Sequence, residues 1–347
     1  MAHCPLQLFE HQSAATHLIR TAMTNMKAAV VHKAGGPEVL SIEAVPIPSP
    51  KSGEVLIRVK AFGLNRSELF TRRGESPTVK FPRILGIEAT GMVEEAPGQE
   101  FRQGDVVVTA MGGMGRSFDG GYAEFTCVPV TQVQRLETSL DWAVLGAIPE
   151  MMQAAWGSLF RSLDLQAGDR LLIRGGTTSV GLAAAGIAKG RGALVAATTR
   201  RPGREKLLRT NGAAQVFIDA GSIAGQVKEV FPGGVDKVLE LVGAASLDDS
   251  LRCVKAHGIV CMTGMVGDKW SIADFNPMDE IPTAVNLTTY SGGAEDFMLT
   301  PLDRLAKQIA EGALHVQPGR VFRLDEIVEA HRCMEHNEAD GKIVVLP

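Results

Sequence analysis

One stretch near the middle of the chain constrains the fold more than any other: residues 171–201 read LLIRGGTTSVGLAAAGIAKGRGALVAATTRR. The stretch begins with the pattern of a buried strand, breaks at two glycines, continues with the small residues of a helix and ends in a second strand pattern. Glycines allow a tight turn and let backbone N–H groups approach a pyrophosphate, and the N-terminus of the following helix adds donors and a favourable dipole. This order of elements predicts a nucleotide-binding turn.

The glycine pattern of this turn is incomplete. Gly176 and Gly181 hold the outer positions of the dinucleotide motif GxGxxG, but Thr178 holds the middle one. Such a match also fits an ordinary strand–helix turn that uses small residues for packing. Strand patterns that alternate with helical ones around the turn favour the nucleotide site and predict a doubly wound parallel sheet. Its expected strands, all within residues 170–264, are RLLIRG, ALVAATT, QVFI, KVLELV and GIVCMTG.

The end of the second strand predicts which nucleotide binds. An acid there would accept a hydrogen bond from the ribose 2′-OH of NAD and repel a 2′-phosphate. The chain has no acid at this point and offers Thr199, Arg200, Arg201 and Arg204 instead. Guanidinium groups match phosphate geometry, so the position of these residues favours NADPH over a merely solvated basic loop. The expected cofactor contacts are Gly176, Thr177, Thr178, Ser179, Val180, Gly181, Thr199, Arg200, Arg204, Gly264 and Met265.

Residues 27–131 have the pattern of short β-strands. EVLIRVKAFG at residues 54–63 alternates apolar and polar side chains, and GGYAEFTCVP at residues 120–129 enters a strand through glycines. Frequent Gly and Pro breaks are typical of an irregular barrel rather than of a parallel sheet. A final segment from about residue 295 contains the helical PLDRLAKQIAEG and ends in GKIVVLP. We therefore expect an α/β protein in which a barrel precedes the parallel sheet.

Composition narrows the classes of function. The chain has 347 residues, enough for two domains, and its 45% hydrophobic and 21% charged residues are typical of a packed globule. A net charge of −4 offers no general attraction for nucleic acid or an anionic membrane. No apolar run approaches the roughly 20 residues that span a bilayer. The five cysteines are scattered, so no disulfide framework is expected and a reducing, cytoplasmic setting is the simplest.

The first 25 residues differ from the rest of the chain. They contain no long apolar core and no clear cleavage site, so they make a poor secretory signal. A transit peptide is a weak alternative, because Glu10 interrupts the segment and Arg20 is its one strong positive charge. The ordered pattern starts at MKAAVVH, from Met26. We expect residues 1–25 to be a disordered or non-native extension.

Four motifs, together with the order of the segments, resemble a known superfamily. They are AFGLNRSEL (61–69), LGIEATGMVEEAPG (85–98), GGTTSVG (175–181) and GKIVV (341–345). With them the chain resembles the medium-chain dehydrogenase/reductase superfamily, and more closely its zinc-free quinone oxidoreductase branch. The resemblance covers nearly all of residues 26–347.

The resemblance implies a domain organisation and an activity. It implies a GroES-like catalytic domain formed by residues 26–147 and 295–347, and a Rossmann NADPH-binding domain formed by residues 148–294. It also implies nucleotide-dependent hydride transfer and, usually, a dimer or tetramer. We expect a homodimer paired through residues 281–293, a β-prone run that follows the fifth parallel strand and would lie at the edge of the sheet.

The zinc-dependent branch of the same superfamily places metal ligands at positions that differ in this chain. Asn65 stands where those relatives have a cysteine, and Ile87 stands where they have a histidine. The region of the third ligand, AIPEMMQAAW, offers Glu150 but no cysteine, and the four clustered cysteines of a structural zinc site are absent. Glu88 remains, but one carboxylate does not hold a metal. We therefore expect no metal.

Candidates for catalysis are few without zinc. Asn65 is the first, because its amide can both donate and accept and could orient the substrate or the nicotinamide. Tyr290 is the second, since it follows the last strand of the sheet where the cleft and the subunit edge meet. Tyr122, the other tyrosine of the chain, is expected to pack in the barrel.

The lack of zinc ligands also favours one class of substrate over another. A quinone or activated alkene delocalises the charge that a hydride brings, whereas an unactivated ketone needs a metal or a strong acid. Ile87, Met151 and Met152 are expected to line a cleft for a small hydrophobic conjugated substrate, although the methionines could equally fill a core. Hydride transfer to a quinone, enal or enone is the predicted function. The alternatives are reduction of other activated alkenes such as enoyl thioesters, and a non-catalytic NADPH-binding protein, either a redox sensor or a structural protein.

Overall fold

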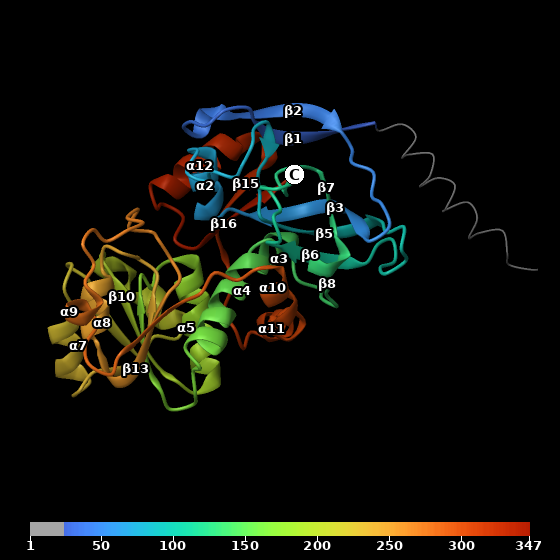
Figure 1. Ribbon diagram of the computed structural model, residues 1–347. Coiled ribbons are helices and arrows are strands. Elements are labelled where there is room, and N and C mark those ends of the chain that lie inside the picture. The colour runs from blue at the N-terminus through green and yellow to red at the C-terminus, as the bar shows by residue number, and fades with distance from the viewer. Residues whose placement is uncertain (1–23) are drawn as a thin grey trace, which may run out of the picture.

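The computed structural model describes residues 24–347, and strand β1 (Asn25–Val31) is its first element. The extension expected at residues 1–25 thus lies outside the described residues, apart from residues 24 and 25. The described chain forms two bodies that meet around helix α4 (Pro149–Gly157), as Figure 1 shows. We call them the front body, with strands β1–β8, β15 and β16, and the Rossmann body, with strands β9–β14.

The Rossmann body is built on a six-stranded sheet with the order β11-β10-β9-β12-β13-β14. All its pairings are parallel. The five predicted strands are present in the order of a dinucleotide-binding sheet, and β14 adds a sixth at the edge. The strands are β9 (Arg170–Arg174), β10 (Leu194–Thr199), β11 (Gln215–Ile218), β12 (Val235–Glu240), β13 (Val254–Met262) and β14 (Asn286–Thr289).

Helices cover both faces of this sheet because its strands are apolar on both sides. On β9, Leu171 and Ile173 pack into the cluster that contains helix α5 (Ser179–Arg191). Leu172, which points the other way, packs into the cluster that contains helices α7 and α8. These and the shorter helices are α6 (Glu205–Thr210), α7 (Ala224–Val230), α8 (Leu247–Arg252), α9 (Pro277–Glu280) and the 3₁₀ turn η4 (Pro202–Arg204).

The front body contains two sheets. One has the order β2-β1-β4, and the larger has the order β15-β16-β3-β5-β6-β8 with β7 paired to β3. Strand β16 comes from the end of the chain and pairs with β3 through Val344 and Val345, so the last segment completes the body that β1 begins. The strands are β1, β2 (Leu40–Pro46), β3 (Glu54–Gly63), β4 (Arg83–Ile84), β5 (Glu88–Glu95), β6 (Val106–Ala110), β7 (Phe125–Pro129), β8 (Val133–Arg135), β15 (Pro318–Arg323) and β16 (Lys342–Leu346).

The remaining helices lie on the front body and at the junction. They are η1 (Pro37–Val39), α2 (Arg66–Arg72), η2 (Val130–Gln132), α3 (Trp142–Leu145), α4, the π-helical η3 (Ser158–Ser162), α10 (Ala294–Leu299), α11 (Leu302–Ala310), η5 (Leu324–Glu326) and α12 (Ile327–Glu335). This is the predicted α/β fold, a GroES-like sheet body followed by a Rossmann sheet. The boundaries proposed for the two domains remain a prediction.

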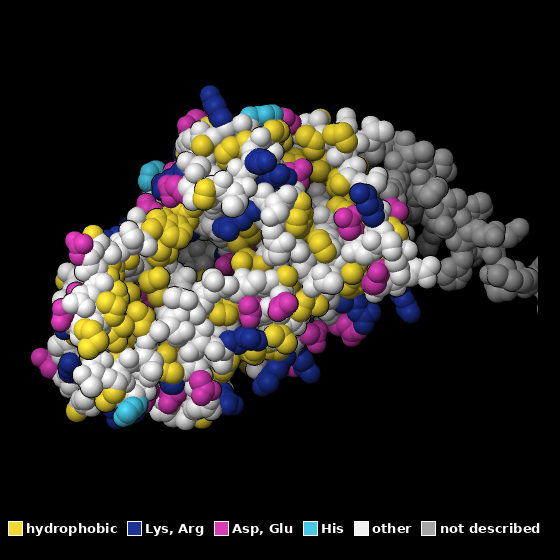
Figure 2. All heavy atoms as spheres, viewed as in Figure 1, with side chains coloured by type: hydrophobic (Ala, Val, Ile, Leu, Met, Phe, Trp, Pro, Cys, Tyr) yellow, Lys and Arg dark blue, Asp and Glu magenta, His cyan; other side chains and the backbone are white. Residues whose placement is uncertain are grey.

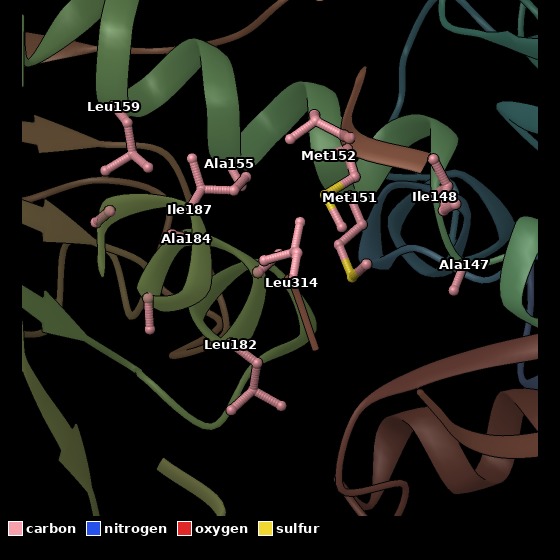
Figure 3. Packing of buried hydrophobic residues seen from close by; sticks show 14 of the residues in the cluster. Ala147, Ile148, Met151, Met152, Ala155, Leu159, Leu182, Ala184, Ile187 and Leu314 are labelled. Atoms are coloured by element: carbon pink, nitrogen blue, oxygen red, sulfur yellow. The ribbon is translucent and has the colours of Figure 1, made fainter. Parts of the chain in front are cut away.

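Helix α4 joins the two bodies through one apolar core. Met151 and Met152 are 4% and 0% exposed and pack in that core with residues of α5 such as Leu182 and Ile187. Figure 3 shows both methionines among these side chains. The expectation that they line the substrate cleft is therefore wrong, because α4 turns this face toward α5 and away from the cleft.

No helix within residues 24–347 has the length and apolarity needed to cross a bilayer.

Strand β14 has one backbone edge turned away from its own sheet. The N–H of Tyr290 donates to the carbonyl of Met262 at 3.2 Å, and the carbonyl of Ala284 accepts from the N–H of His257 at 2.8 Å. Backbone groups of alternate residues point to opposite sides of a strand, so Leu287 and Thr289 direct their N–H and C=O groups outward. The side chain of Leu287 packs inward against its own core. The carbonyl of Thr289 accepts from the hydroxyl of Ser162 at 3.1 Å, so the backbone groups of Leu287 form the part of this edge that is available for pairing with a second copy.

We predict that the protein is a homodimer paired along β14 and that Leu287→Pro converts it to a monomer. The substitution removes an outward N–H donor, and Pro also disturbs the edge geometry. Leu287→Ala is the matched control, because it trims the same side chain but keeps the donor, and it should remain dimeric. Light scattering measures the mass of each. A monomeric wild type, or a folded Leu287→Pro variant that stays dimeric, would place the interface elsewhere.

Candidate active site

A cleft of about 920 Å³ separates the two bodies. Figure 2 shows the molecule hollowed between them, with hydrophobic side chains gathered at the rim. The volume lies within the range of roughly 300–1,000 Å³ that is usual for ligand pockets. The cleft runs from the turn after β9 and the end of β10, in the Rossmann body, to α2, α4 and β16 on the other side. It opens beyond the carboxyl ends of the parallel strands, where such sheets bind ligands.

The turn after β9 uses its glycines and its threonine for different purposes. Gly175 adopts φ +79°, so the residue in the left-handed conformation precedes the predicted motif. A Cβ on Gly181 would lie 2.7 Å from the carbonyl oxygen of Gly176, so only glycine allows α5 to start this close to the turn. Thr178 caps α5: its hydroxyl accepts from the N–H of Gly181 at 3.0 Å and donates to the carbonyl of Gly175 at 2.9 Å. A threonine in the middle position is thus compatible with the turn.

The predicted contacts of this turn divide into those that face the cleft and those that shape it. Thr177, Thr178, Ser179 and Val180 line the cleft, as do Gly264 and Met265 after β13. Gly176 and Gly181 are not among the lining residues and act through the close packing described above. Four consecutive residues at a helix N-terminus therefore face the space where the sequence predicts a pyrophosphate.

The basic residues after β10 lie at one end of the cleft. The hydroxyl of Thr199 forms two hydrogen bonds with the backbone of Arg201. It accepts from the N–H of Arg201 at 3.1 Å and donates to the carbonyl of Arg201 at 3.2 Å. Arg200 and Arg204 line the cleft, whereas Arg201 does not. Arg204 forms an ion pair with Asp340 of the front body, and Arg200 is exposed. Thr199 therefore shapes the turn, and Arg200 is the cation most open to a ligand.

The front body adds an arginine to this end that the sequence analysis did not single out. Arg66, the first residue of α2, donates from Nη2 to Oδ1 of Asn337 at 2.6 Å. Burial lowers the pKa of Arg66, and the positive charges of Arg73 and Arg200 lower it further. Arg66 and Arg200 both line the cleft, and the positive charge of Arg200 acts on Arg66. The sequence could have pointed to Arg66, because it directly follows Asn65 in the motif AFGLNRSEL.

A buried network supports the floor of the cofactor end. Arg174, the last residue of β9, is fully buried and donates to both carboxylate oxygens of Asp219 at 2.9 and 3.1 Å. It also donates to Asp249 of α8 at 2.6 Å. A buried guanidinium with paired carboxylates links the ends of β9 and β11 to α8. The network therefore holds together the strand ends from which the cofactor turn rises.

The other side of the cleft contains a buried charged group that we call the Lys342 cluster: Asn65, Glu68, Glu88, Glu150 and Lys342. Lys342 begins β16, and its side chain is 2% exposed. Its Nζ lies 2.8 Å from Oε1 of Glu88 and 3.3 Å from Oε2 of Glu150, and it donates to Oδ1 of Asn65. An ammonium has three hydrogens, so these three oxygens satisfy it. The motif GKIVV marks the family, but the pattern alone assigns Lys342 no role.

Asn65 is an integral part of this cluster. Its Nδ2 donates to Glu88 Oε1 at 2.9 Å and to Glu68 Oε1 at 3.3 Å, while its Oδ1 accepts from Lys342. Its backbone N–H donates to Glu68 Oε2 at 3.1 Å at the start of α2. Asn65 lines the cleft, as expected, but its amide is engaged by the cluster. The geometry therefore favours a positioning role over direct contact of this amide with a substrate.

Two carboxyl groups of the cluster, those of Glu68 and Glu150, have a raised pKa and hold protons more tightly than usual. Burial raises the pKa of Glu68 to about 7, and the nearby charge of Glu88 adds to the effect. Burial also raises the pKa of Glu150, against the attraction of Lys342. The pKa of Lys342 is itself raised: burial would lower it, but the charges of Glu88 and Glu150 outweigh this. One ammonium faces three carboxyl groups, so the cluster favours retaining a proton.

An aromatic pair lines the cleft where the two bodies meet. Phe70 of α2 meets Trp270 of the Rossmann body edge-to-face, with ring centroids 4.7 Å apart. Arg73 and Asp268 form an ion pair beside it, at 3.3 Å. Both aromatic rings line the cleft, as does Ile87, which sequence reasoning expected there. The apolar wall therefore comes from both bodies and not from the methionines of α4.

Tyr290 lines the cleft after β14, as the sequence analysis expected. Burial raises the pKa of its hydroxyl to about 12. Tyr122 packs in the front body, where its hydroxyl lies 3.1 Å from Nε2 of His331. Neither phenol is therefore suited to protonate a substrate in the cleft near neutral pH. Tyr290 holds its proton tightly, and Tyr122 lies away from the cleft.

Known proteins resemble the chain over nearly its full length. Residues 51–138 match the family described as alcohol dehydrogenase GroES-like domain, and residues 211–345 match the family described as zinc-binding dehydrogenase. The chain is 30% identical to quinone oxidoreductase of Pongo abelii over 336 residues, which cover 94% of this chain and 99% of that protein. It is 27% identical to 2-haloacrylate reductase of a Burkholderia species over 337 residues, or 92% and 98% of the two chains.

A solved structure also matches both bodies together. Mycobacterial Rv1454c, solved in complex with NADPH, superposes with a TM-score of 0.82 at 28% sequence identity. The match covers 93% of this chain and all of that one.

Proposed function

Because the chain belongs to the medium-chain dehydrogenase/reductase superfamily, in its quinone oxidoreductase-like branch, we propose that it transfers a hydride from NADPH to a quinone or a conjugated enal or enone, without zinc. The membership makes the chain an oxidoreductase, which argues against a purely structural or sensory NADPH-binding protein. One observation carries the finer proposal. One cleft is lined by the turn after β9, by the apolar side chains Phe70, Trp270 and Ile87, and by Glu150 and Lys342 of the Lys342 cluster.

The residues of the cofactor end fit NADPH. Thr177, Ser179 and Val180 present a helix N-terminus to a pyrophosphate, and Arg200 would bind the 2′-phosphate with Arg66 near it. No acid stands at the end of β10 to prefer the unphosphorylated ribose. A relative of the same fold was solved with NADPH. Bound NADPH supplies the hydride.

The Lys342 cluster does not suit zinc, although one matching family is described as zinc-binding. Of the positions that carry zinc ligands in relatives, Asn65 and Glu150 bind the ammonium of Lys342, and Ile87 offers no ligand. The ammonium of Lys342 already bonds to oxygens that a metal would need as ligands. Within residues 24–347, no group of three His, Cys, Asp or Glu side chains is arranged to hold a metal ion. These contacts support zinc-independent chemistry.

The substrate end of the cleft favours a flat conjugated acceptor. Phe70, Trp270 and Ile87 provide an apolar wall that suits a flat, hydrophobic acceptor. Relatives are named for reducing quinones and a haloacrylate, both of which are conjugated acceptors. The second name supports reduction of other activated alkenes as the second candidate function.

We expect NADPH-loaded protein to lose its nicotinamide absorbance in the stopped flow when mixed with menadione or with conjugated enones and enals. Such acceptors take a hydride without a metal, because they delocalise the charge. Simple ketones and aldehydes are the control and should react much more slowly. A protein that binds NADPH but passes its hydride to none of these acceptors would contradict the proposed function.

We predict that replacing Arg200 and Arg204 by Ala together weakens NADPH binding by about 2–4 kcal/mol, because charge-assisted bonds to the 2′-phosphate are lost. NADH binding should hardly change. Arg201→Ala is the matched control, because that side chain does not line the cleft, and it should leave both affinities unchanged. Fluorescence titration with each nucleotide measures the effect. An equal loss for both nucleotides would contradict the 2′-phosphate assignment.

We predict that the purified protein contains no stoichiometric zinc and keeps its quinone reductase activity after chelation, because Lys342 already occupies the carboxylates. Elemental analysis before and after incubation with zinc, followed by desalting, measures the content. One tightly held zinc per chain, or loss of activity on chelation, would show that the cluster releases Lys342 to accept a metal.

A further inference from the structure

We propose that Glu150 is the proton donor of this oxidoreductase, an acid that Lys342 and Glu88 hold in the wall of the cleft. It would protonate a conjugated substrate after the hydride has arrived. The inference rests on the proposed function, since it requires a substrate that gains a hydrogen at carbon. It identifies a catalytic residue that the sequence analysis considered only as a metal ligand.

Glu150 is held on two sides and open on a third. It lies in the first turn of α4, and its backbone N–H donates to Glu88 Oε2 at 2.9 Å. Its Oε2 accepts from Lys342 at 3.3 Å. Among the described residues its Oε1 takes part in no hydrogen bond, and its side chain is 21% exposed at the cleft. The backbone and one oxygen thus fix the group, while the other oxygen is free to meet a substrate.

Glu150 is the one carboxyl of the cluster that reaches the cleft. Glu68 and Glu88 are 1% and 0% exposed and do not line the cleft. The charged and titratable groups that face Glu150 are Lys342 from β16, Glu88 from β5 and Tyr290 after β14. Burial and the charge of Glu88 raise the pKa of Glu150, so its protonated form persists to higher pH than in an exposed glutamate.

Other groups near the substrate end are poorer donors. All three hydrogens of Lys342 are directed at Asn65, Glu88 and Glu150. Tyr290 has a pKa of about 12. Three further acids line the cleft: Asp219 and Asp340 are paired with Arg174 and Arg204 at the cofactor end, and Glu75 is exposed to solvent outside the Lys342 cluster. The acid placed to serve the substrate end is therefore Glu150.

The proton balance follows from this geometry. A hydride with its electron pair adds to the β-carbon of a conjugated carbonyl compound, and the alkene electrons move toward the carbonyl oxygen to form an enolate. The O–H bond of Glu150 then breaks as a C–H bond forms at the α-carbon, which leaves a carboxylate beside Lys342. Water at the exposed side returns the proton. One hydride and one proton are consumed for each alkene reduced. A quinone gains its hydrogens on oxygen, which water can protonate directly, so Glu150 is dispensable for quinones.

The test compares carvone, a cyclic enone with a methyl group on its α-carbon, with menadione, a quinone. Glu150→Gln keeps the shape of the side chain but has no acidic proton. We expect single-turnover reduction of carvone to fall about 100-fold or more, the usual effect of losing a general acid. Menadione reduction should stay within a small factor. Because the two substrates share the cofactor and the cleft, an unfolded or cofactor-free variant would lose both and is detected by NADPH binding.

Two further readouts separate a proton donor from a structural residue. The wild-type rate with carvone should fall as pH rises through the pKa of Glu150, since the protonated form is the active one, and Glu150→Gln should lose this dependence. Wild type should give mainly one diastereomer of dihydrocarvone, because the acid delivers the proton to one face. The variant should give a mixture. Glu150→Asp, which keeps an acid on a shorter side chain, should recover part of the rate and the selectivity.

Glu75→Gln is the control variant, because it removes an exposed carboxylate from the mouth of the same cleft outside the Lys342 cluster. It should leave the carvone-to-menadione ratio unchanged. Equal rates and equal diastereomer ratios for wild type and Glu150→Gln would overturn the role of Glu150 while leaving the proposed function intact. So would a wild type that reduces menadione but no conjugated enone or enal. A wild type that reduces none of these compounds would overturn both.

Discussion

The structure depends on how one buried ammonium is neutralised. Lys342 lies in the interior, where an unpaired charge is very costly, and it bonds to Asn65, Glu88 and Glu150. These partners come from the start of α2, from β5 and from α4, so one side chain from the end of the chain joins three elements. Breaking a buried pair of this kind by removing one partner costs about 3–5 kcal/mol. The wall of the cleft, the last strand and the helix between the bodies are therefore held together by the same charge.

The two ends of the cleft use different groups, one to bind the cofactor and the other to bind the substrate. The Rossmann end uses backbone geometry, a capped helix and arginines, which suit a phosphate-bearing nucleotide. The other end uses side chains from both bodies, with the Phe70–Trp270 contact and the Arg73–Asp268 ion pair spanning the gap. A hydride donor and its acceptor would meet between these ends. The chemistry proposed here thus belongs to the interface of the bodies, and neither body alone contains the site.

Sequence reasoning succeeded where the signal was local. The parallel strands were visible as short apolar runs, and Gly181 and Thr178 could be placed at the start of a helix because close packing and capping need those residue types nearby. The place of Arg200 on the cleft agrees with its position after the second strand, while its contact with a 2′-phosphate stays a prediction. Sequence reasoning was wrong about Met151 and Met152, because an apolar helix pattern does not say which of two neighbours, core or cleft, a given face meets. It did not identify the roles of Lys342, Trp270 or Arg66, because each acquires its role from a partner distant in the chain.

The order of strands and helices, the glycine turn and the lack of an acid after the second strand can all be read from the amino-acid sequence, and with them the preference expected for NADPH. These follow from backbone conformation and from residues within one turn of each other. Contacts between distant elements establish that the amide of Asn65 is engaged internally, that Lys342 bonds to Asn65, Glu88 and Glu150, and that Glu150 alone of three clustered carboxyls reaches the cleft. The physical reason is that charge pairing and burial depend on distances between elements more than 190 positions apart in the chain, such as α4 and β16.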